Sequence, residues 1–409
     1  MGVLAINGGP KAAAALESIV WPRLQPQDVA AVERAVKDNY WGGLGDDNLP
    51  NRVFEREFTK YCGAKHGITV ANGTVSLELS LRAGGIRPGD EVIVPAITFI
   101  ASATAIVSAG ALPVFADVDP DTCQISAESV ESLITPKTRG IIVVHYGGYM
   151  ADMDAITGVA RKHGLIVVED CAHAQGSQWR GRGAGTLGEF GSYSFQHSKS
   201  LSAGEGGIVL TDDDALFERA VLMMNIGRKQ GQAGYGHYLS ASNWRMGGLQ
   251  AALLLSQFQR FPEEAEERNR NGNYLRNELG KIPGLKVLKE DGRLTRHGYY
   301  FAVIKFDEKE FGCSRDKFRE AIAAEGADVG TGYDRPIYKE PAFAYENLRP
   351  LLHESIAIPD YNGLCLPNAE EWAATQITTG QARLLGDGTN AELLVRTIKK
   401  IKENVHELA

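Results

Sequence analysis

The sequence predicts an α/β protein with a large domain around a mostly parallel sheet and a smaller C-terminal α+β domain. Short β-rich runs alternate with helical patterns between about residues 66 and 212, which is typical of a parallel sheet covered by helices. After about Trp244 this alternation gives way to long helical patterns. A chain of 409 residues is also long for one simple core. We therefore expect a large domain over residues 1–260, including an N-terminal arm, and a small domain over residues 261–409.

The elements of the large domain follow from periodicity and turn residues. Charged and apolar residues recur at helical spacing over residues 27–39 and 51–62, so two helices precede the sheet. The expected strands are HGITVA (66–71), EVIVPA (91–96), ALPVFADVD (111–119), GIIVVHY (140–146), LIVVED (165–170), FGSYSF (190–195) and GGIVLTD (206–212). The expected helices between them are VSLELSLRA (75–83), TFIASATAIVSAG (98–110) and MDAITGVARKHG (153–164).

The small domain has its own pattern. Residues 247–279 read as one long helix or two, with an interruption at Pro262. A strand is expected within residues 297–307 and helices within 314–325 and 392–405, the last of them amphipathic and basic.

Composition excludes several classes of protein. The net charge of −8 argues against general attraction to nucleic acid or to anionic membranes. The five cysteines are scattered without CxxC spacing, which favours reduced thiols in a cytoplasmic protein over disulfides or a metal site. The start MGVLAINGG lacks the basic residues of a signal peptide. The apolar run 95–116 is broken by polar residues, so we interpret it as a buried helix and strand, not as a membrane span.

Two motifs are weaker than they look. The run GAGTLG at 183–188 satisfies GxGxxG but leads into a strand, whereas a dinucleotide site needs a helix N-terminus there. Asp117, Asp119 and Asp121 resemble the start of a calcium loop, but Pro120 lies inside it and Thr122 replaces the required glycine. We expect an ordinary turn.

Three strand ends carry candidate chemistry. In parallel sheets, ligands bind outside the carboxyl ends of the strands. There, LIVVED ends in Asp170, HGITVA leads into Asn72-Gly73-Thr74, and FGSYSF precedes Lys199. Taken singly, they have structural alternatives: an ion pair, a helix cap and a solvated lysine. Together they fit pyridoxal 5′-phosphate (PLP), which needs a phosphate-binding turn, an acidic partner for its pyridine nitrogen and a lysine for a Schiff base.

Five segments also resemble the DegT/StrS-type sugar aminotransferases. They are TVANGTVSLELSL, GDEVIVPAITFIASA, VVEDCAHAQGS, SYSFQHSKSLSAGEGG and SNWRMGGLQAALLLSQ, and the resemblance extends over nearly the whole chain. INGG together with SNWRM looks most like the branch with scyllo-inosose aminotransferases and amino-hydroxybenzoate synthases. The resemblance implies a fold-type I PLP-dependent transferase that acts as a homodimer with shared active sites.

The resemblance also implies residue roles. Lys199 would form the Schiff base and shuttle protons, and Asp170 would pair with the pyridine nitrogen. Phe99 would stack on the ring and His173 would lie near its 3′-oxygen. The phosphate would be bound by Gly73, Thr74 and Ser194 and by Asn243 of the neighbouring subunit. For Asn243, a helix cap within its own chain is the alternative that the sequence leaves open.

The expected activity is amino transfer from glutamate or glutamine to a keto-sugar or keto-cyclitol, by a ping-pong mechanism. One alternative is a PLP-dependent lyase or dehydratase, such as an amino-hydroxybenzoate synthase. Another is a non-catalytic PLP-binding regulator, against which the intact Lys199 and Asp170 argue. Basic residues that could bind a nucleotide-sugar are Arg228, Lys229, Arg245, Arg335 and Lys339; groups that could bind cyclitol hydroxyls are His145, Tyr146, Tyr333 and Tyr338.

Overall fold

The computed structural model describes residues 2–16, 19–42, 47–229 and 236–408. Its centre is a seven-stranded sheet in the order β1-β9-β8-β5-β4-β2-β3. The strands are β1 (His66–Val70), β2 (Glu91–Pro95), β3 (Leu112–Ala116), β4 (Thr138–Val144), β5 (Ile166–Asp170), β8 (Phe190–Ser194) and β9 (Gly207–Thr211). From β3 to β8 all neighbours are parallel, and only β9 pairs antiparallel with β8 and β1. The predicted mostly parallel sheet is confirmed.

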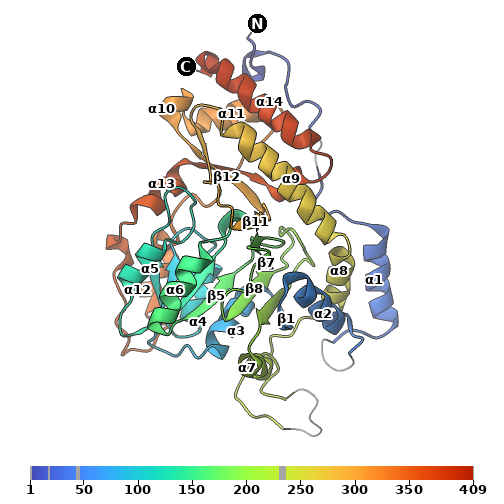
Figure 1. The fold of residues 1–409 in the computed structure, drawn as a ribbon, viewed down its shortest axis with the longest axis vertical. Coiled ribbons are helices and arrows are strands. Elements are labelled where there is room, and N and C mark those ends of the chain that lie inside the picture. The colour runs from blue at the N-terminus through green and yellow to red at the C-terminus, as the bar shows by residue number, and fades with distance from the viewer. Residues whose placement is uncertain (1, 17–18, 43–46, 230–235, 409) are drawn as a thin grey trace.

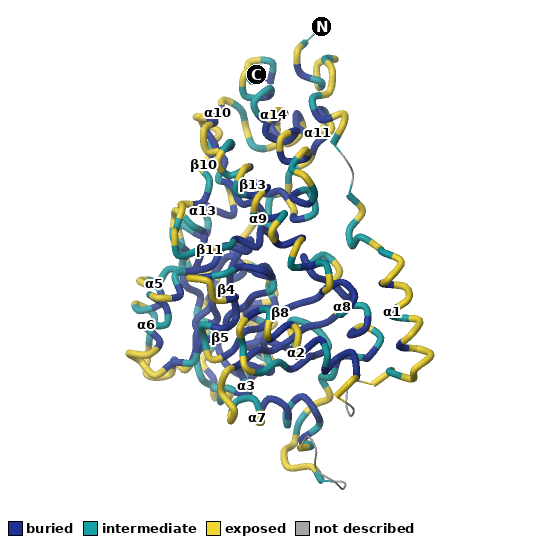
Figure 2. Tube along the Cα trace, turned by 45° about the vertical axis from the view of Figure 1, so that its right-hand side comes forward, coloured by how far each residue is buried: buried dark blue, intermediate teal, exposed yellow. Residues whose placement is uncertain are grey.

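Helices cover both faces of this sheet (Figure 1). One face carries α3 (Gly73–Ala83), α4 (Ala101–Ser108) and α7 (Asp214–Met224); the other carries α2 (Pro50–Cys62), α5 (Ala127–Leu133), α6 (Met153–His163) and α8 (Gly248–Phe258), with α1 (Pro26–Lys37) packed on α8. Alternate side chains of a strand enter the two cores: Ile142 lies on the first side, Ile141 and Val143 on the second. Because both faces are covered, the central strands are almost wholly buried, as Figure 2 shows.

A smaller three-stranded sheet, in the order β10-β12-β13, lies towards the chain termini. Its strands are β10 (Leu285–Val287), β12 (Phe301–Phe306) and β13 (Gln376–Gly380), and helices α9 (Phe261–Leu279), α10 (Glu308–Phe311), α11 (Arg315–Ala324) and α14 (Thr389–Glu403) accompany it. Pro262 stands in the first turn of α9, so the long helical pattern is two helices, as the proline indicated. The N-terminal segment joins this core through Leu4 and Ala13.

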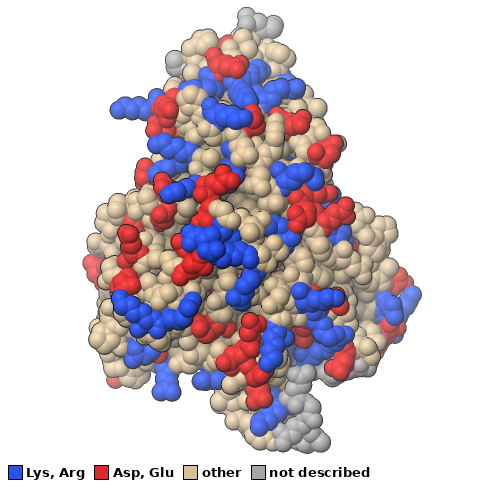
Figure 3. Space-filling view, viewed as in Figure 1, with Lys and Arg blue, Asp and Glu red and all other residues tan. Residues whose placement is uncertain are grey.

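Residues 337–373 pack against the large sheet before the chain returns to the smaller one at β13. Helix α12 (Tyr345–Leu348) and α13 (Pro367–Thr375) follow there, and Tyr338, Phe343 and Trp372 belong to the same core as Phe115 of β3. The division at residue 260 therefore stays a prediction. No helix of the described ranges is long and apolar enough to cross a membrane, and acidic and basic side chains are interspersed over the face seen in Figure 3.

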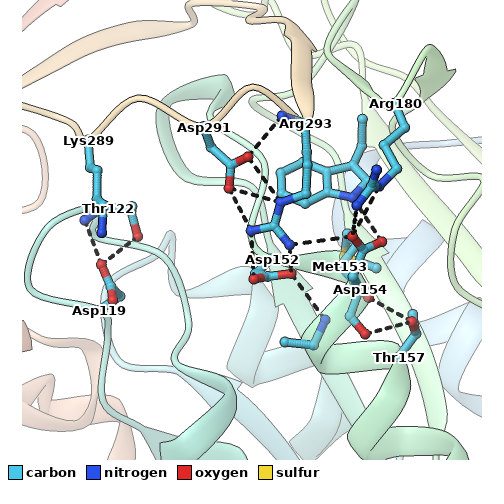
Figure 4. A network of polar contacts seen from close by, with 12 residues as sticks. Asp119, Thr122, Asp152, Met153, Asp154, Thr157, Arg180, Lys289, Asp291 and Arg293 are labelled. Atoms are coloured by element: carbon cyan, nitrogen blue, oxygen red, sulfur yellow. Dashed lines mark hydrogen bonds and ion pairs between the residues drawn. The ribbon is translucent and has the colours of Figure 1, made fainter.

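A third sheet, in the order β11-β6-β7, joins the segment after β10 to the connection between β5 and β8 of the large sheet. Its strands are β6 (Gln178–Trp179), β7 (Arg182–Gly183) and β11 (Leu294–Arg296). Arg293, just before β11, donates to Asp152 at the start of α6 and to Asp291, while Arg180 binds Asp154 (Figure 4). These charge-assisted contacts fix the crossing segment.

The calcium-like run forms a turn, as expected. Asp119 Oδ1 accepts hydrogen bonds from the amides of Asp121 and Thr122 and from the Thr122 hydroxyl, which are visible in part in Figure 4. Asp117 accepts the amide of Ala369. These carboxylates therefore stabilise backbone turns.

Candidate active site

A cavity of about 610 Å³ opens at the carboxyl ends of the strands. Seven of the eight predicted site residues line it: Gly73, Thr74, Phe99, Asp170, His173, Ser194 and Lys199. They come from separate segments between Gly73 and Lys199, which the parallel topology brings to one edge. The remaining residue, Asn243, does not line this cavity.

Asp170 is the last residue of β5 and is 5% exposed. Its Oδ2 accepts the Ser102 hydroxyl at 2.8 Å and its Oδ1 accepts the Ala172 amide at 3.1 Å. Burial raises the pKa of this carboxyl, because the charged form is poorly solvated, although the Ser102 hydrogen bond opposes the rise. The ionised form of Asp170 is therefore stabilised by a cationic partner in the cavity.

Lys199 stands in the turn after β8, with its Nζ 4.5 Å from the centre of the Tyr300 ring. Burial lowers the pKa of its amine to about 8, and the nearby Asp170 carboxylate partly offsets this. A neutral amine is the nucleophilic form of lysine. A much larger fraction of this amine than of an ordinary lysine is therefore neutral at pH 7, and most of it is neutral at pH 9.

The other end of the cavity is the N-terminus of α3. The Asn72 side chain caps the helix by accepting the Val75 amide at 2.9 Å. For the amides of Gly73 and Thr74, no acceptor is found within the described ranges. A β-carbon at Gly73 would lie 2.5 Å from the Ser194 β-carbon, so only glycine permits this approach of α3 to β8. Free amides at a helix start beside a serine hydroxyl suit a phosphate group.

His173 and Phe99 form two walls of the cavity. The Gly147 amide donates to His173 Nδ1 at 3.4 Å, and burial holds the pKa of His173 well below its usual value, so the ring is neutral with its proton on Nε2. Phe99 precedes α4 instead of lying within the expected helix 98–110, and its ring is 54% exposed. Such an exposed aromatic ring at a cavity offers a stacking surface for a flat ligand.

Asn243 lies outside the cavity of its own chain. It is exposed, forms an isolated bridge with Asn225, and its Oδ1 accepts the Arg245 amide at 3.3 Å. The N-cap of α8 is Gly247, so the alternative of a cap for that helix is wrong.

Two tyrosines of the cavity had no assigned catalytic or cofactor-binding role in the sequence. Tyr300, next to β12, stacks on His173 with ring centres 4.2 Å apart, and the Tyr333 hydroxyl lies 3.4 Å from His173 Nε2. For Tyr300, the sequence signal was the pair Tyr299-Tyr300 directly before the strand 301–306. Of the four groups considered for cyclitol hydroxyls, only Tyr333 lines the cavity, and none of the five basic residues considered for a nucleotide does.

A second buried cluster lies behind Asp170. Glu169 is 0% exposed and accepts the amides of Gly185, Leu187 and Gly188 together with His145 Nε2 at 3.0 Å. Burial alone would raise its pKa, but these hydrogen bonds lower it, so Glu169 stays ionised. The glycine-rich run thus binds an internal carboxylate. His145, Glu169 and Cys171 approach one another as metal ligands do, but both Glu169 oxygens and both His145 ring nitrogens already have partners.

Comparison with known proteins agrees with this geometry. The model of the DegT/DnrJ/EryC1/StrS aminotransferase family matches residues 22–378. A putative L-glutamine:3-amino-2,3-dideoxy-scyllo-inosose aminotransferase from Streptoalloteichus tenebrarius is 36% identical over 397 residues, 95% of each chain.

Solved structures show the same likeness. The crystal structure of 3-amino-5-hydroxybenzoic acid synthase has a TM-score of 0.83 and 30% identity, covering 96% of this chain and 99% of the other. S. venezuelae DesV in complex with a ketimine intermediate has a TM-score of 0.80 and 31% identity, covering 92% and 94%. Because the family model matches most of the chain and the cavity contains the lysine and the aspartate, the chain belongs to the DegT/DnrJ/EryC1/StrS aminotransferase family and is a PLP-dependent aminotransferase.

Proposed function

We propose that this enzyme transfers the amino group of L-glutamine to a keto-cyclitol, with both half-reactions in the cavity that contains Lys199 and Asp170. The observation that carries the proposal is the juxtaposition in one cavity of a lysine with a depressed pKa, a buried carboxylate and a helix start with free amides. The donor and acceptor follow the named activity of the Streptoalloteichus relative. A keto-sugar acceptor is the nearest alternative.

The residues fit PLP at both of its ends. The amides of Gly73 and Thr74 and the Ser194 hydroxyl would hold its phosphate, and Asp170 would hold its pyridine nitrogen. A buried carboxylate without a cationic partner is energetically costly. The protonated pyridine nitrogen would supply that partner, and Asp170 would in turn stabilise the protonated form of the nitrogen. When bound, the cofactor supplies an electron sink for charge that develops on the substrate carbon.

Lys199 would move the proton. In its neutral form, which burial favours, the amine would take a proton from the substrate carbon, and as an ammonium group it would return that proton to the cofactor. Asp170 raises the pKa of Lys199 and so stabilises the ammonium form, whereas burial lowers this pKa. Because the two effects oppose each other, both protonation states are accessible near pH 8. Phe99 would stack on the flat ring, His173 would lie near its 3′-oxygen, and Tyr333 would offer a hydroxyl to the acceptor.

We further propose a cytoplasmic homodimer in which Asn243 binds the phosphate in the partner's site. Phe99 at the cavity mouth is half exposed, and Trp41 and Leu24 are 61% and 72% exposed, which a partner subunit would cover.

The test measures transamination with purified protein. Glutamine and a keto-cyclitol should give an amino-cyclitol, and a nucleotide-linked keto-sugar should be a poor acceptor. Lys199→Ala should lose turnover at least about 10³-fold while the melting temperature stays close to wild type. Lys162→Ala, an exposed lysine of α6 that pairs with Glu131, is the matched control and should keep activity. Formation of an aromatic product without net amino transfer would instead favour a lyase or dehydratase.

A further inference from the structure

Four residues form hydrogen bonds with the main chain of residues 199–201, the lysine turn: Gln196, Gln175, Trp21 and Arg268. The Lys199 amide donates to the Gln196 carbonyl at 2.9 Å within the turn. The Gln175 side chain then takes both polar groups of Leu201: its Oε1 accepts the amide and its Nε2 donates to the carbonyl at 3.2 Å. Gln175 is 2% exposed, so these bonds are shielded from water.

The carbonyl groups of Lys199 and Ser200 bind side chains from distant segments. Trp21 Nε1–H donates to the Lys199 carbonyl at 3.1 Å, and the guanidinium of Arg268 on α9 donates to the Ser200 carbonyl at 3.4 Å. Arg268 is fully buried, and its guanidinium carbon lies 5.3 Å from the centre of the Trp21 ring. Trp21 therefore touches both the lysine turn and the arginine that supports it.

The bond from Trp21 differs from the others in its origin. Trp21 stands in the segment before α1, whereas the other partners belong to the turn itself, to the loop after β5 or to α9. A carbonyl fixed at Lys199 fixes the Cα from which the amine reaches the cavity, and catalysis is sensitive to displacements of about 1 Å at such groups.

We propose that Trp21 is a positioning residue: its indole N–H holds the main chain of Lys199 so that the amine meets both proton-transfer positions. The proposal rests on the proposed role of Lys199. It assigns to the N-terminal segment a part in catalysis without contact with substrate or cofactor.

The test uses Trp21→Phe, which keeps an aromatic ring beside Arg268 but removes the indole donor. Hydrogen exchange of the Lys199 and Leu201 amides in the cofactor-free enzyme should speed up about three- to tenfold, because one supporting hydrogen bond is lost. In the holoenzyme, kcat should fall by a similar about three- to tenfold while KM for glutamine and for the acceptor stays within about twofold. The melting temperature should change little.

Trp372→Phe is the matched control. The Trp372 indole N–H is buried and lacks a hydrogen-bond partner within the described residues, so losing it should alter neither the exchange of the lysine turn nor kcat. Unchanged exchange at Lys199 and Leu201 in Trp21→Phe, or faster exchange throughout the protein, would overturn the proposal. Because exchange is measured without cofactor or substrate, this result is independent of the proposed reaction.

Discussion

At the scale of single residues, two opposed influences set the charge of Lys199. Burial destabilises its ammonium form and Asp170 stabilises it, with a resulting pKa of about 8 against an ordinary value of 10.5. The amine is therefore mostly protonated at pH 7 and mostly neutral at pH 9. Reactions that need the neutral amine should follow this titration.

The rate at which the cofactor-free enzyme captures PLP should rise with pH to a plateau, with a midpoint of about 8. In Asp170→Asn the midpoint should move to lower pH, because the carboxylate that favours the ammonium form is gone. Stopped-flow absorbance measures the rate. Asp214→Asn, whose side chain is 68% exposed and pairs with Lys65, is the matched control. A wild-type midpoint near 10 would contradict this prediction.

Asp170→Asn should also lower kcat by about 10²–10⁴-fold, since losing a buried charge partner costs about 3–5 kcal/mol. Ser102→Ala removes only the 2.8 Å hydrogen bond to Asp170 Oδ2 and should cost about tenfold or less. Steady-state kinetics with saturated cofactor measures both. Equal losses in the two variants would mean that the orientation of Asp170, not its charge, matters most.

At the scale of elements, the loop 183–188 depends on Glu169. One carboxylate accepts three amides of this loop, in which Gly185 has φ of 77°, a conformation that favours glycine. The same strand end carries Asp170 towards the cavity. The loop therefore fixes the end of β5 through Glu169, while Asp170 of the same strand end lines the cavity.

Glu169→Gln should destabilise the protein by about 3–5 kcal/mol, because an amide N–H₂ would face loop N–H donors in a buried site. Chemical unfolding measures the difference. Glu189→Gln is the matched control: Glu189 also accepts one backbone amide, that of Val167, but is exposed, so its cost should be about 1 kcal/mol or less.

The same carboxylate should contribute to acid unfolding. Its folded pKa is lowered, so its stabilisation is complete above the pKa of unfolded glutamate, about 4.3, and is lost as pH falls through the lower folded value. Wild type should lose stability more steeply below about pH 4.3 than Glu169→Gln. Parallel pH curves for the two proteins would show that Glu169 is not the group responsible.

At the scale of the whole molecule, the proposed dimer makes a test by complementation. Lys199→Ala and Asn243→Asp should each be inactive alone, the second because it sets a negative charge beside the phosphate. After subunit exchange at equal amounts, half of the dimers are mixed and each has one intact site, so about a quarter of wild-type activity should return. Asn362→Asp, an exposed asparagine, controls for the added charge and should be active without exchange. No recovery after verified exchange would refute a shared site.

The sequence alone determined the sheet, most helices and the chemistry of the site. These features rest on local signals: apolar periodicity, turn glycines, and the types of residue that follow strands. Parallel strands end at a common edge, so Asp170, Lys199 and Thr74 could be expected together before any coordinates were known. Phe99 lines the cavity but lies outside the helix expected for it, since helix boundaries depend on end contacts that periodicity does not specify.

Only the tertiary structure decided which groups contact the site residues. Glu169 and Asp170 are adjacent acids at one strand end. Glu169 accepts amides of the loop 183–188 whereas Asp170 lines the cavity, because neighbouring side chains of a strand point to opposite faces. Gly185, Tyr300 and Trp21 lie 16, 101 and 178 residues away in sequence from their partners Glu169, Lys199 and again Lys199. Such contacts carry no local periodicity. They exist because burial of two cores and their connecting segments brings those backbones together, which is a property of the whole fold.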